Sequence, residues 1–271
     1  MSSMVLKKRL ISALVMLFLL GSVGLFATPN IQPYCVSLIL MIALIEWWHM
    51  MGLKAVIMLS LSLFWLMLSV VKINQLGFFM LFGLSLLGLM FFLWLAFRGR
   101  QHSASVCTKI VEVSYSLILF LCLKIAMVGL WAMGWPTLLW AMSVVWITDT
   151  MAYFAGKAIG KVRCFGPVSP NKTLEGCLAG FFAGILVFML GPMMALFQID
   201  VSWWWRLMIA IMAVLFAIFG DLLESGMKRF HHVKDSGGWI PGHGGLWDRI
   251  DAMMFTLPFL WFTQYVFVFG A

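Results

Sequence analysis

The stretch LGFFMLFGLSLLGLMFFLWLAF, residues 76–97, runs for 22 residues without a charged side chain. About 20 apolar residues in a helix are enough to cross the ~30 Å hydrocarbon core of a bilayer. Because lipid offers no hydrogen-bond partners, each backbone N–H and C=O of a spanning segment must be satisfied within the protein, and a helix achieves this by itself. The stretch therefore predicts a transmembrane helix and places the chain among integral membrane proteins.

Eight further apolar stretches of similar length follow the same pattern. They lie at about 9–27, 34–50, 53–71, 113–133, 137–155, 174–197, 204–222 and 252–270. The composition agrees, with 63% hydrophobic and 10% charged residues, and the alternation expected of barrel strands is absent. We predict an all-α polytopic membrane protein with about nine transmembrane helices. The first run is long for a signal peptide and lacks a clear cleavage site, so we expect a retained helix.

Basic residues are distributed unevenly around these spans. With the N-terminus in the cytoplasm, 15 of the 18 Lys and Arg residues fall on the cytoplasmic side, Lys72 and Arg206 fall outside, and Lys124 lies within a span. Such a bias is typical of cytoplasmic loops, so the N-terminus is predicted to be cytoplasmic. Topology and attraction to anionic lipids then explain the net charge of +8, and nucleic-acid binding is not indicated. The short length and the lack of an added targeting segment favour a bacterial inner (plasma) membrane.

The first half of the chain, residues 1–135, is predicted to form hydrophobic helices with short connections. Glu46, Glu112 and Lys124 are its isolated charges in or near spans. Charge is costly near lipid, so we expect these three side chains to make polar contacts between helices or at the membrane interface. The five Cys residues show no CxxC spacing, which favours reduced, apolar packing residues over disulfides or a zinc site.

The second half, residues 136–271, is predicted to be a catalytic transmembrane region with two polar loops. These loops, 156–173 and 223–250, are rich in Gly, Lys, Asp and His, and both fall on the predicted cytoplasmic side. The segment DLLESGMKRFHHVKDSGGWIPGHGGLWDRID, residues 221–251, holds five of the ten carboxylates and four of the eighteen Lys and Arg residues. Such a concentration of charge beside lipid indicates a functional site.

Two groups of polar residues have helical spacing. Asp149, Tyr153 and Lys157 recur every four residues and therefore share one helix face. A second shared face, at the end of the span 204–222, consists of Asp221, Glu224, Ser225 and Lys228. A carboxylate buried at Asp149 needs a cation, which could be a metal ion or a lysine from another helix.

The motif SPNKTLEG, residues 169–176, predicts the start of a helix. Thr173 is placed to cap that helix, and Glu175 in the first turn favours the same arrangement. Lys172 and the free N–H groups of the first turn would form an anion site. A plain capped loop explains the motif equally well.

The residue types in the two loops indicate metal-dependent chemistry on phosphates. Mg²⁺ commonly binds one or two carboxylates together with substrate phosphates, and Lys and Arg neutralise phosphate oxygens. Phosphoryl and nucleotidyl transfer need chiefly positioning and charge neutralisation. The GxxxxGK[ST], GxSxG and HExxH motifs are absent. We expect His231 and His232 at the surface, while His243, flanked by glycines, is open between a structural and a catalytic role.

Three spaced motifs carry a family resemblance. The longest contains Ser225-x-x-Lys228-Arg229, then Lys234-Asp235-Ser236-Gly237, then Pro241-Gly242-His243-Gly244-Gly245-x-x-Asp248-Arg249-x-Asp251. The others are Asp149-Thr150-x-Ala152-Tyr153-x-x-Gly156-Lys157 and Ser169-Pro170-x-Lys172-Thr173-x-Glu175-Gly176. Together they closely resemble the signature of phosphatidate cytidylyltransferases, also called CDP-diacylglycerol synthases. The resemblance covers about residues 145–255; the first half resembles the family only in its hydrophobic helices and contributes little.

The resemblance implies transfer of CMP from CTP to phosphatidate, which gives CDP-diacylglycerol and pyrophosphate in phospholipid biosynthesis. It also implies a Mg²⁺-dependent site, in some members with K⁺, and metal binding by Asp221 and Asp248. The catalytic residues that it implies are Asp221, Lys228, Arg229, Lys234, Asp235, His243, Asp248, Arg249 and Asp251. The substrate-binding residues that it implies are Asp149, Tyr153, Lys157, Ser169, Lys172, Thr173, Ser225, Ser236, Gly244 and Gly245.

Two other functions compete with this interpretation. Membrane carboxylates also mark the ion pathways of secondary transporters, although those favour charges near the bilayer midplane and not in loops on one side. Another lipid nucleotidyl- or phosphotransferase is the second alternative, although the DG-x2-AR pattern of CDP-alcohol phosphotransferases is absent. The expected partners are CTP, phosphatidate and the bilayer, without nucleic acid, and the oligomeric state, a homodimer included, is open.

Overall fold

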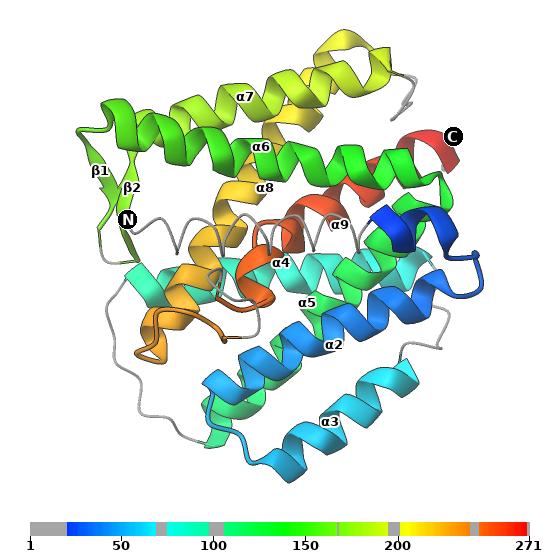
Figure 1. Cartoon of the computed structure of the whole chain (residues 1–271), viewed down its shortest axis with the longest axis vertical. Helices are drawn as coiled ribbons and strands as arrows, with labels where there is room; N and C mark the ends of the chain where they lie inside the picture. The colour runs from blue at the N-terminus through cyan, green and yellow to red at the C-terminus, as the bar shows by residue number, and fades with distance from the viewer. Residues whose placement is uncertain are drawn as a thin grey trace.

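The computed structural model describes residues 21–68, 75–97, 106–166, 168–194, 201–238 and 244–269. These residues are mainly helical (Figure 1). The helices are α2 (Gln32–Met50), α3 (Ala55–Leu68), α4 (Gln75–Phe97), α5 (Val106–Ala132), α6 (Trp135–Ile159), α7 (Leu174–Met193), α8 (Trp203–Phe230) and α9 (Met253–Gln264). Residues 21–26 are also helical, and a π-helical turn, Tyr265–Phe269, follows α9.

The predicted all-α polytopic class is confirmed. Among the described residues, six helices are long and apolar enough to cross a membrane, namely α2, α4, α5, α6, α7 and α8. Helix α3 has 14 residues and α9 has 12. Most of the predicted first span, 9–27, lies outside the described residues, so the count of nine spans and the orientation of the N-terminus stay predictions.

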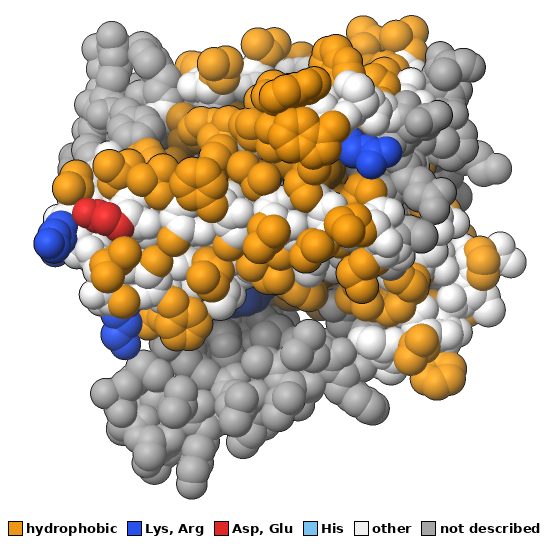
Figure 2. All heavy atoms as spheres, turned by 90° about the horizontal axis from the view of Figure 1, so that it is seen from above, with side chains coloured by type: hydrophobic (Ala, Val, Ile, Leu, Met, Phe, Trp, Pro, Cys, Tyr) orange, Lys and Arg blue, Asp and Glu red, His pale blue; other side chains and the backbone are white. Residues whose placement is uncertain are grey.

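The outer surface is apolar where lipid would cover it. Leu178, Phe182 and Leu186 lie four residues apart on α7 and are all exposed. Figure 2 shows a face of this kind, with hydrophobic side chains over most of it and charged side chains near its margins. An exposed apolar face of this extent suits contact with acyl chains, because soluble proteins rarely expose so large an apolar surface to water.

Helices α6 and α7 lie side by side and pack with their backbones close together (Figure 1). A Cβ atom added at Gly180 would lie 2.5 Å from the carbonyl oxygen of Thr148, and one at Gly176 would lie 2.5 Å from that of Ala152. Small residues at such contacts let transmembrane helices approach closely and gain van der Waals packing. In the view of Figure 1, α8 crosses this pair of helices.

The connection between α6 and α7 differs from the predicted polar loop 156–173. Helix α6 continues to Ile159, and the strands β1 (Arg163–Phe165) and β2 (Ser169–Thr173) form an antiparallel hairpin. Thr173 caps α7 as predicted, since its hydroxyl accepts a hydrogen bond from the Gly176 amide at 3.3 Å. Glu175 accepts hydrogen bonds from the amides of Lys161 and Val162 at 3.0 and 3.3 Å. These bonds tie the base of the hairpin to the start of α7.

The second predicted loop, 223–250, begins later than expected. Helix α8 continues to Phe230, so its 28 residues extend over about 42 Å, which exceeds the ~30 Å hydrocarbon core. An ion pair between Glu224 and Lys228, one helical turn apart, supports this last part of the helix. A 3₁₀ helix, η1 (Trp247–Arg249), then leads into α9.

Candidate active site

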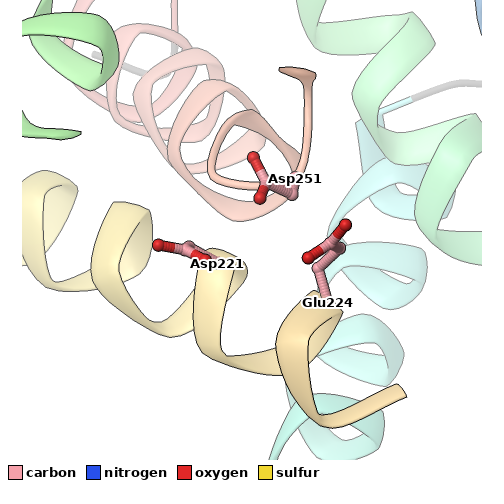
Figure 3. Close-up of side chains that lie close together, drawn as sticks. All are labelled: Asp221, Glu224 and Asp251. Atoms are coloured by element: carbon pink, nitrogen blue, oxygen red, sulfur yellow. The ribbon is translucent and has the colours of Figure 1, made fainter. Parts of the chain in front are cut away.

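Three carboxylates meet where the end of α8 passes the start of α9 (Figure 3). Asp221 and Glu224 share a face of α8 because they are three residues apart, and Asp251 precedes α9. One oxygen of each carboxylate lies within 4.8 Å of the other two. A Cβ atom at Gly220 would lie 2.7 Å from the carbonyl oxygen of Asp251. The glycine therefore allows the close backbone approach that brings the third carboxylate to the other two.

Glu224 is the most buried of the three, with 1% of its surface exposed. Its Oε2 atom lies 2.6 Å from the Lys228 ammonium group, whereas Oε1 is buried and accepts no hydrogen bond from the part of the chain that the structure describes. An ionised carboxylate oxygen in that position needs either a proton or a cation. Two oxygens on opposite sides of a Mg²⁺ ion lie about 4.2 Å apart. The three carboxylates therefore offer the oxygen ligands that a divalent cation prefers, within 4.8 Å of one another.

Burial also affects the protonation of Asp251. Burial is the main cause that raises the pKa of Asp251 well above its usual value, and the charges of Asp221 and Asp149 raise it further. A carboxylate group of this kind retains a proton unless a cation compensates its charge. Metal binding would therefore release a proton from the cluster.

Asp248 is held by other partners. The Lys228 ammonium group donates to Asp248 Oδ1 at 3.0 Å, and the backbone amides of Gly245 and Ser236 donate to the carboxylate at 2.9 and 3.3 Å. Burial alone would raise the pKa of Asp248, but its interactions with Glu224, the Gly245 amide and Lys228 outweigh burial and lower this pKa to about 2. Asp248 therefore remains ionised and fixes both Lys228 and the loop before η1.

Lys172 brings a positive charge from β2 to the carboxylates. Its ammonium group lies 2.5 Å from Asp221 Oδ2. Burial by itself would lower the pKa of Lys172, but the ion pair with Asp221, together with the charges of Asp149 and Asp251, raises it. Lys172 is therefore charged at neutral pH, and it joins the hairpin to α8.

Two cavities of about 340 and 290 Å³ adjoin the carboxylates, and Asp149 and Asp221 line both of them. The larger cavity is lined from α6, β2, α7 and α8 by both apolar and polar residues. The lining of the smaller cavity is entirely polar: Asp149, Asp221, Glu224, Ser225, Lys228, Asp235, Asp248, Arg249 and Asp251. Six carboxylates against two basic side chains give the smaller cavity an excess of negative charge that favours a cation.

Residues 7–267 match the family model described as "Cytidylyltransferase family". The chain belongs to this cytidylyltransferase family. The match extends over the first half of the chain as well as over the motif region, residues 145–255.

Individual relatives of this family member carry the name phosphatidate cytidylyltransferase. Proteins of that name from Staphylococcus haemolyticus and Staphylococcus aureus are each 44% identical over 129 residues, which is 47% of this chain and 48% of theirs. One from Staphylococcus epidermidis is 45% identical over 129 residues. The match thus spans about half the length of the curated relatives.

Most of the predicted site residues of this cytidylyltransferase-family chain lie around the two cavities. Those that line the larger cavity are Asp149, Tyr153, Lys157, Lys172, Thr173 and Asp221. Those that line the smaller one are Asp149, Asp221, Ser225, Lys228, Asp235, Asp248, Arg249 and Asp251. Ser236, Gly244 and Gly245 lie beside Asp248. Arg229, Lys234 and Ser169 line neither cavity, and His243 lies outside the described residues.

One expectation about individual residues stays a prediction, and another is wrong. Asp221 and Asp248, the predicted metal pair, both line the smaller cavity, and metal binding by this pair stays a prediction. Asp221 also lies close to Glu224 and Asp251, while Asp248 accepts hydrogen bonds from Lys228 and two backbone amides. The expectation that His231 lies at the surface is wrong. Its side chain is 12% exposed, and its Nε2 atom lies 2.9 Å from Glu112 Oε2.

Three carboxylates outside the predicted site residues make buried polar contacts. Glu224 could have been included because its three-residue spacing from Asp221 was visible in the sequence. Glu46 and Glu112 contact residues 190 and 119 positions further along the chain. Apart from the rarity of charge in a membrane helix, the sequence carried no signal that identified their partners.

Proposed function

We propose that this protein transfers CMP from CTP to phosphatidate, giving CDP-diacylglycerol and pyrophosphate. The observation that carries the proposal is the cluster of Asp221, Glu224 and Asp251 between two adjoining cavities, with Lys172 and Lys228 in contact with it. The family and the names of the relatives support the same reaction. A transporter site would instead favour charges near the bilayer midplane.

Asp221, Glu224 and Asp251 would hold Mg²⁺. The bound ion would neutralise phosphate oxygens of CTP and the charge that develops on the leaving pyrophosphate. Lys228 and Arg249, in the lining of the polar cavity, would bind phosphate oxygens of the nucleotide. Lys172 would stand between the nucleotide and the lipid phosphate, because it reaches Asp221 from the wall of the larger cavity.

The reaction needs little from the protein beyond positioning. A phosphate oxygen of phosphatidate forms a bond to the α-phosphorus of CTP, and the bond from that phosphorus to the bridging oxygen of the β-phosphate breaks. The attacking phosphate is already ionised at neutral pH, so no strong general base is required. We propose the all-polar cavity for the CTP phosphates and the larger cavity, with Tyr153 and Ile218 in its lining, for the lipid phosphate and glycerol.

We also propose that the site faces the cytoplasm from a bacterial inner membrane. Fifteen of the 18 Lys and Arg residues support this orientation through the positive-inside bias. CTP is available in the cytoplasm, and phosphatidate would present its phosphate at the same membrane surface.

The assay uses purified protein in detergent–lipid micelles with radiolabelled CTP, phosphatidate and Mg²⁺. We expect a labelled lipid product, and we expect Asp221→Asn and Asp251→Asn to lower its rate of formation by about 100-fold or more because the metal ligands are lost. Glu112→Gln is the matched control, since this carboxylate is also buried but lines neither cavity. If well-folded wild-type protein gives no lipid-linked CMP, the proposed reaction is wrong.

A further inference from the structure

Glu46 is a buried carboxylate on α2, far in sequence from the acidic cluster, with 2% of its surface exposed. Three donors converge on it from a single loop. The Ser236 hydroxyl donates to Oε2 at 3.1 Å, the Leu246 amide donates to Oε1 at 3.0 Å, and the Trp247 amide donates to Oε2 at 2.8 Å. Both oxygens of the carboxylate are therefore engaged, by both ends of the segment 236–247.

The loop is shaped to receive this carboxylate. A Cβ atom at Gly237 would lie 2.8 Å from Glu46 Oε1, and one at Gly245 would overlap Oε2. The neighbouring Trp47 stacks on Trp247, with ring centroids 4.3 Å apart and an interplanar angle of 13°. Two glycines and a stacked aromatic pair thus let the end of α2 dock directly against the loop.

Burying a carboxylate is costly unless its oxygens are satisfied. Among the described residues, no ion pair involves Glu46. Its charge is instead compensated by charge-assisted hydrogen bonds from two consecutive amides and a hydroxyl. An apolar residue at this position would leave these three donors without an acceptor, so the carboxylate secures the positions of the residues that carry them.

The loop leads directly to the site. Ser236 contacts both carboxylates: its hydroxyl donates to Glu46, and its backbone amide donates to Asp248. The Gly245 amide also donates to Asp248. Asp248 in turn holds Lys228, which pairs with Glu224 of the acidic cluster. Glu46 is therefore connected to the cluster through a continuous series of short polar contacts.

We infer that Glu46 is a positioning residue for the reaction. It holds residues 236–237 and 245–247, the described ends of the segment 236–247, and through them it sets the positions of Asp248 and Lys228. The inference rests on the proposed function and extends it, because it makes helix α2 of the first half a part of the catalytic apparatus. Glu46 itself lines neither cavity.

The test compares Glu46→Gln with Glu112→Gln, which removes another buried carboxylate of the first half outside this loop. Glutamine keeps the size of the side chain but turns an NH₂ group toward at least one of the three donors. We expect Glu46→Gln to lower kcat about 10-fold or more while the KM for CTP changes less than about threefold. We expect Glu112→Gln to retain kcat within about twofold, and both variants to remain monodisperse.

Hydrogen exchange measured by mass spectrometry gives a second readout that does not depend on activity. We expect Glu46→Gln to accelerate exchange in peptides that contain the amides of Leu246 and Trp247, and Glu112→Gln to leave them unchanged. If the wild-type protein makes no lipid product, the proposed function fails, and the exchange data still decide the role of Glu46 in the loop.

A milder substitution tests the same inference in case Glu46→Gln fails to fold. Ser236→Ala removes one donor and leaves the two amides in place, so we expect it to lower kcat by about threefold in the wild-type background and not at all in the Glu46→Gln background. Additive effects of the two substitutions would overturn the inference. So would unchanged exchange at 246–247 together with a kcat within twofold of wild type.

Discussion

At the scale of single residues, Asp248 shows how neighbouring groups fix the charge of one carboxylate. It is partly buried, yet an ammonium group and two backbone amides compensate its charge. Removing one member of such a group leaves the others unpaired in a poorly solvated place, which costs more than the net contribution of the intact contact. The stability of the fold should therefore depend on the ionisation of this side chain.

Asp248→Asn should destabilise the metal-free protein by about 2 kcal/mol at neutral pH. The pKa of Asp248 is lowered from its ordinary value of 3.8 to about 2 in the folded protein. Ionised Asp248 thus stabilises the fold above pH 3.8, and this contribution is lost as the pH falls through about 2. Thermal unfolding in detergent at several pH values measures the difference. The control is Asp235→Asn, at an exposed position. If the difference in stability between the wild-type protein and Asp248→Asn does not shrink in acid, the prediction is wrong.

The same scale shows where sequence-based prediction of the site stopped. Helical spacing was enough to place Asp221 and Glu224 on one face. Whether Asp248 or Asp251 joins them depends on the backbone around η1, including Gly244 with φ of 84°. A turn of this kind reverses the direction of side chains within a few residues, and the sequence did not specify that direction.

At the scale of secondary structure, the contact between α6 and α7 depends on small residues. Gly180 lies against the backbone of α6, where a Cβ atom would be 2.5 Å from the Thr148 oxygen and 2.9 Å from the Ala152 Cβ. A methyl group can be accommodated there only if the two helices separate, and the cavity that they line together with α8 would change as well.

Gly180→Ala should therefore destabilise the protein by about 1–3 kcal/mol through overpacking. Gly83 on α4 is the matched control because nothing lies within 4 Å of its added Cβ atom, and alanine is the better helix former by about 1 kcal/mol. Gly83→Ala should be neutral or slightly stabilising. Unfolding by heat or by denaturing detergent measures the stability of both variants. If Gly180→Ala is as stable as Gly83→Ala, the contact between α6 and α7 accommodates a methyl group and the prediction is wrong.

Uncharged runs predicted most of the helices, because lipid requires long apolar segments. The ends of the helices were harder to predict. Glu224 and Lys228 made the end of α8 look like a polar loop, although their spacing supports a helix. The hairpin of β1 and β2 was missed because its strands are only three and five residues long, and because the Glu175 hydrogen bonds to the amides of Lys161 and Val162 at its base join residues 13–14 positions apart.

At the scale of the whole molecule, binding of a cation should couple to the stability of the fold. The cluster joins α8 to the segment before α9, so a ligand that binds only the folded protein raises its stability, by about 2.7 kcal/mol at a concentration of 100 Kd. The raised pKa of Asp251 adds a pH dependence, because a retained proton competes with the metal.

Mg²⁺ should therefore raise the Tm of the wild-type protein, and chelation with EDTA should reverse the increase. The half-saturating Mg²⁺ concentration should fall as the pH rises and Asp251 loses its proton. Asp251→Asn should remove most of both effects, whereas Glu112→Gln should preserve them. Thermal scans over a range of Mg²⁺ concentrations and pH values give the measurement. A Tm that does not change with Mg²⁺ concentration at any pH would rule out a metal at these three carboxylates.

The docking of α2 against residues 236–237 and 245–247 has a consequence for any attempt to shorten the protein. A fragment that begins at residue 136 would retain all six carboxylates of the polar cavity. It would nevertheless lack the acceptor for the Ser236 hydroxyl and the amides of Leu246 and Trp247, as well as the indole ring that stacks on Trp247. Supplying α2 on a separate, co-expressed polypeptide would restore these contacts in principle, so the two halves are better regarded as obligate folding partners than as an anchor and an enzyme.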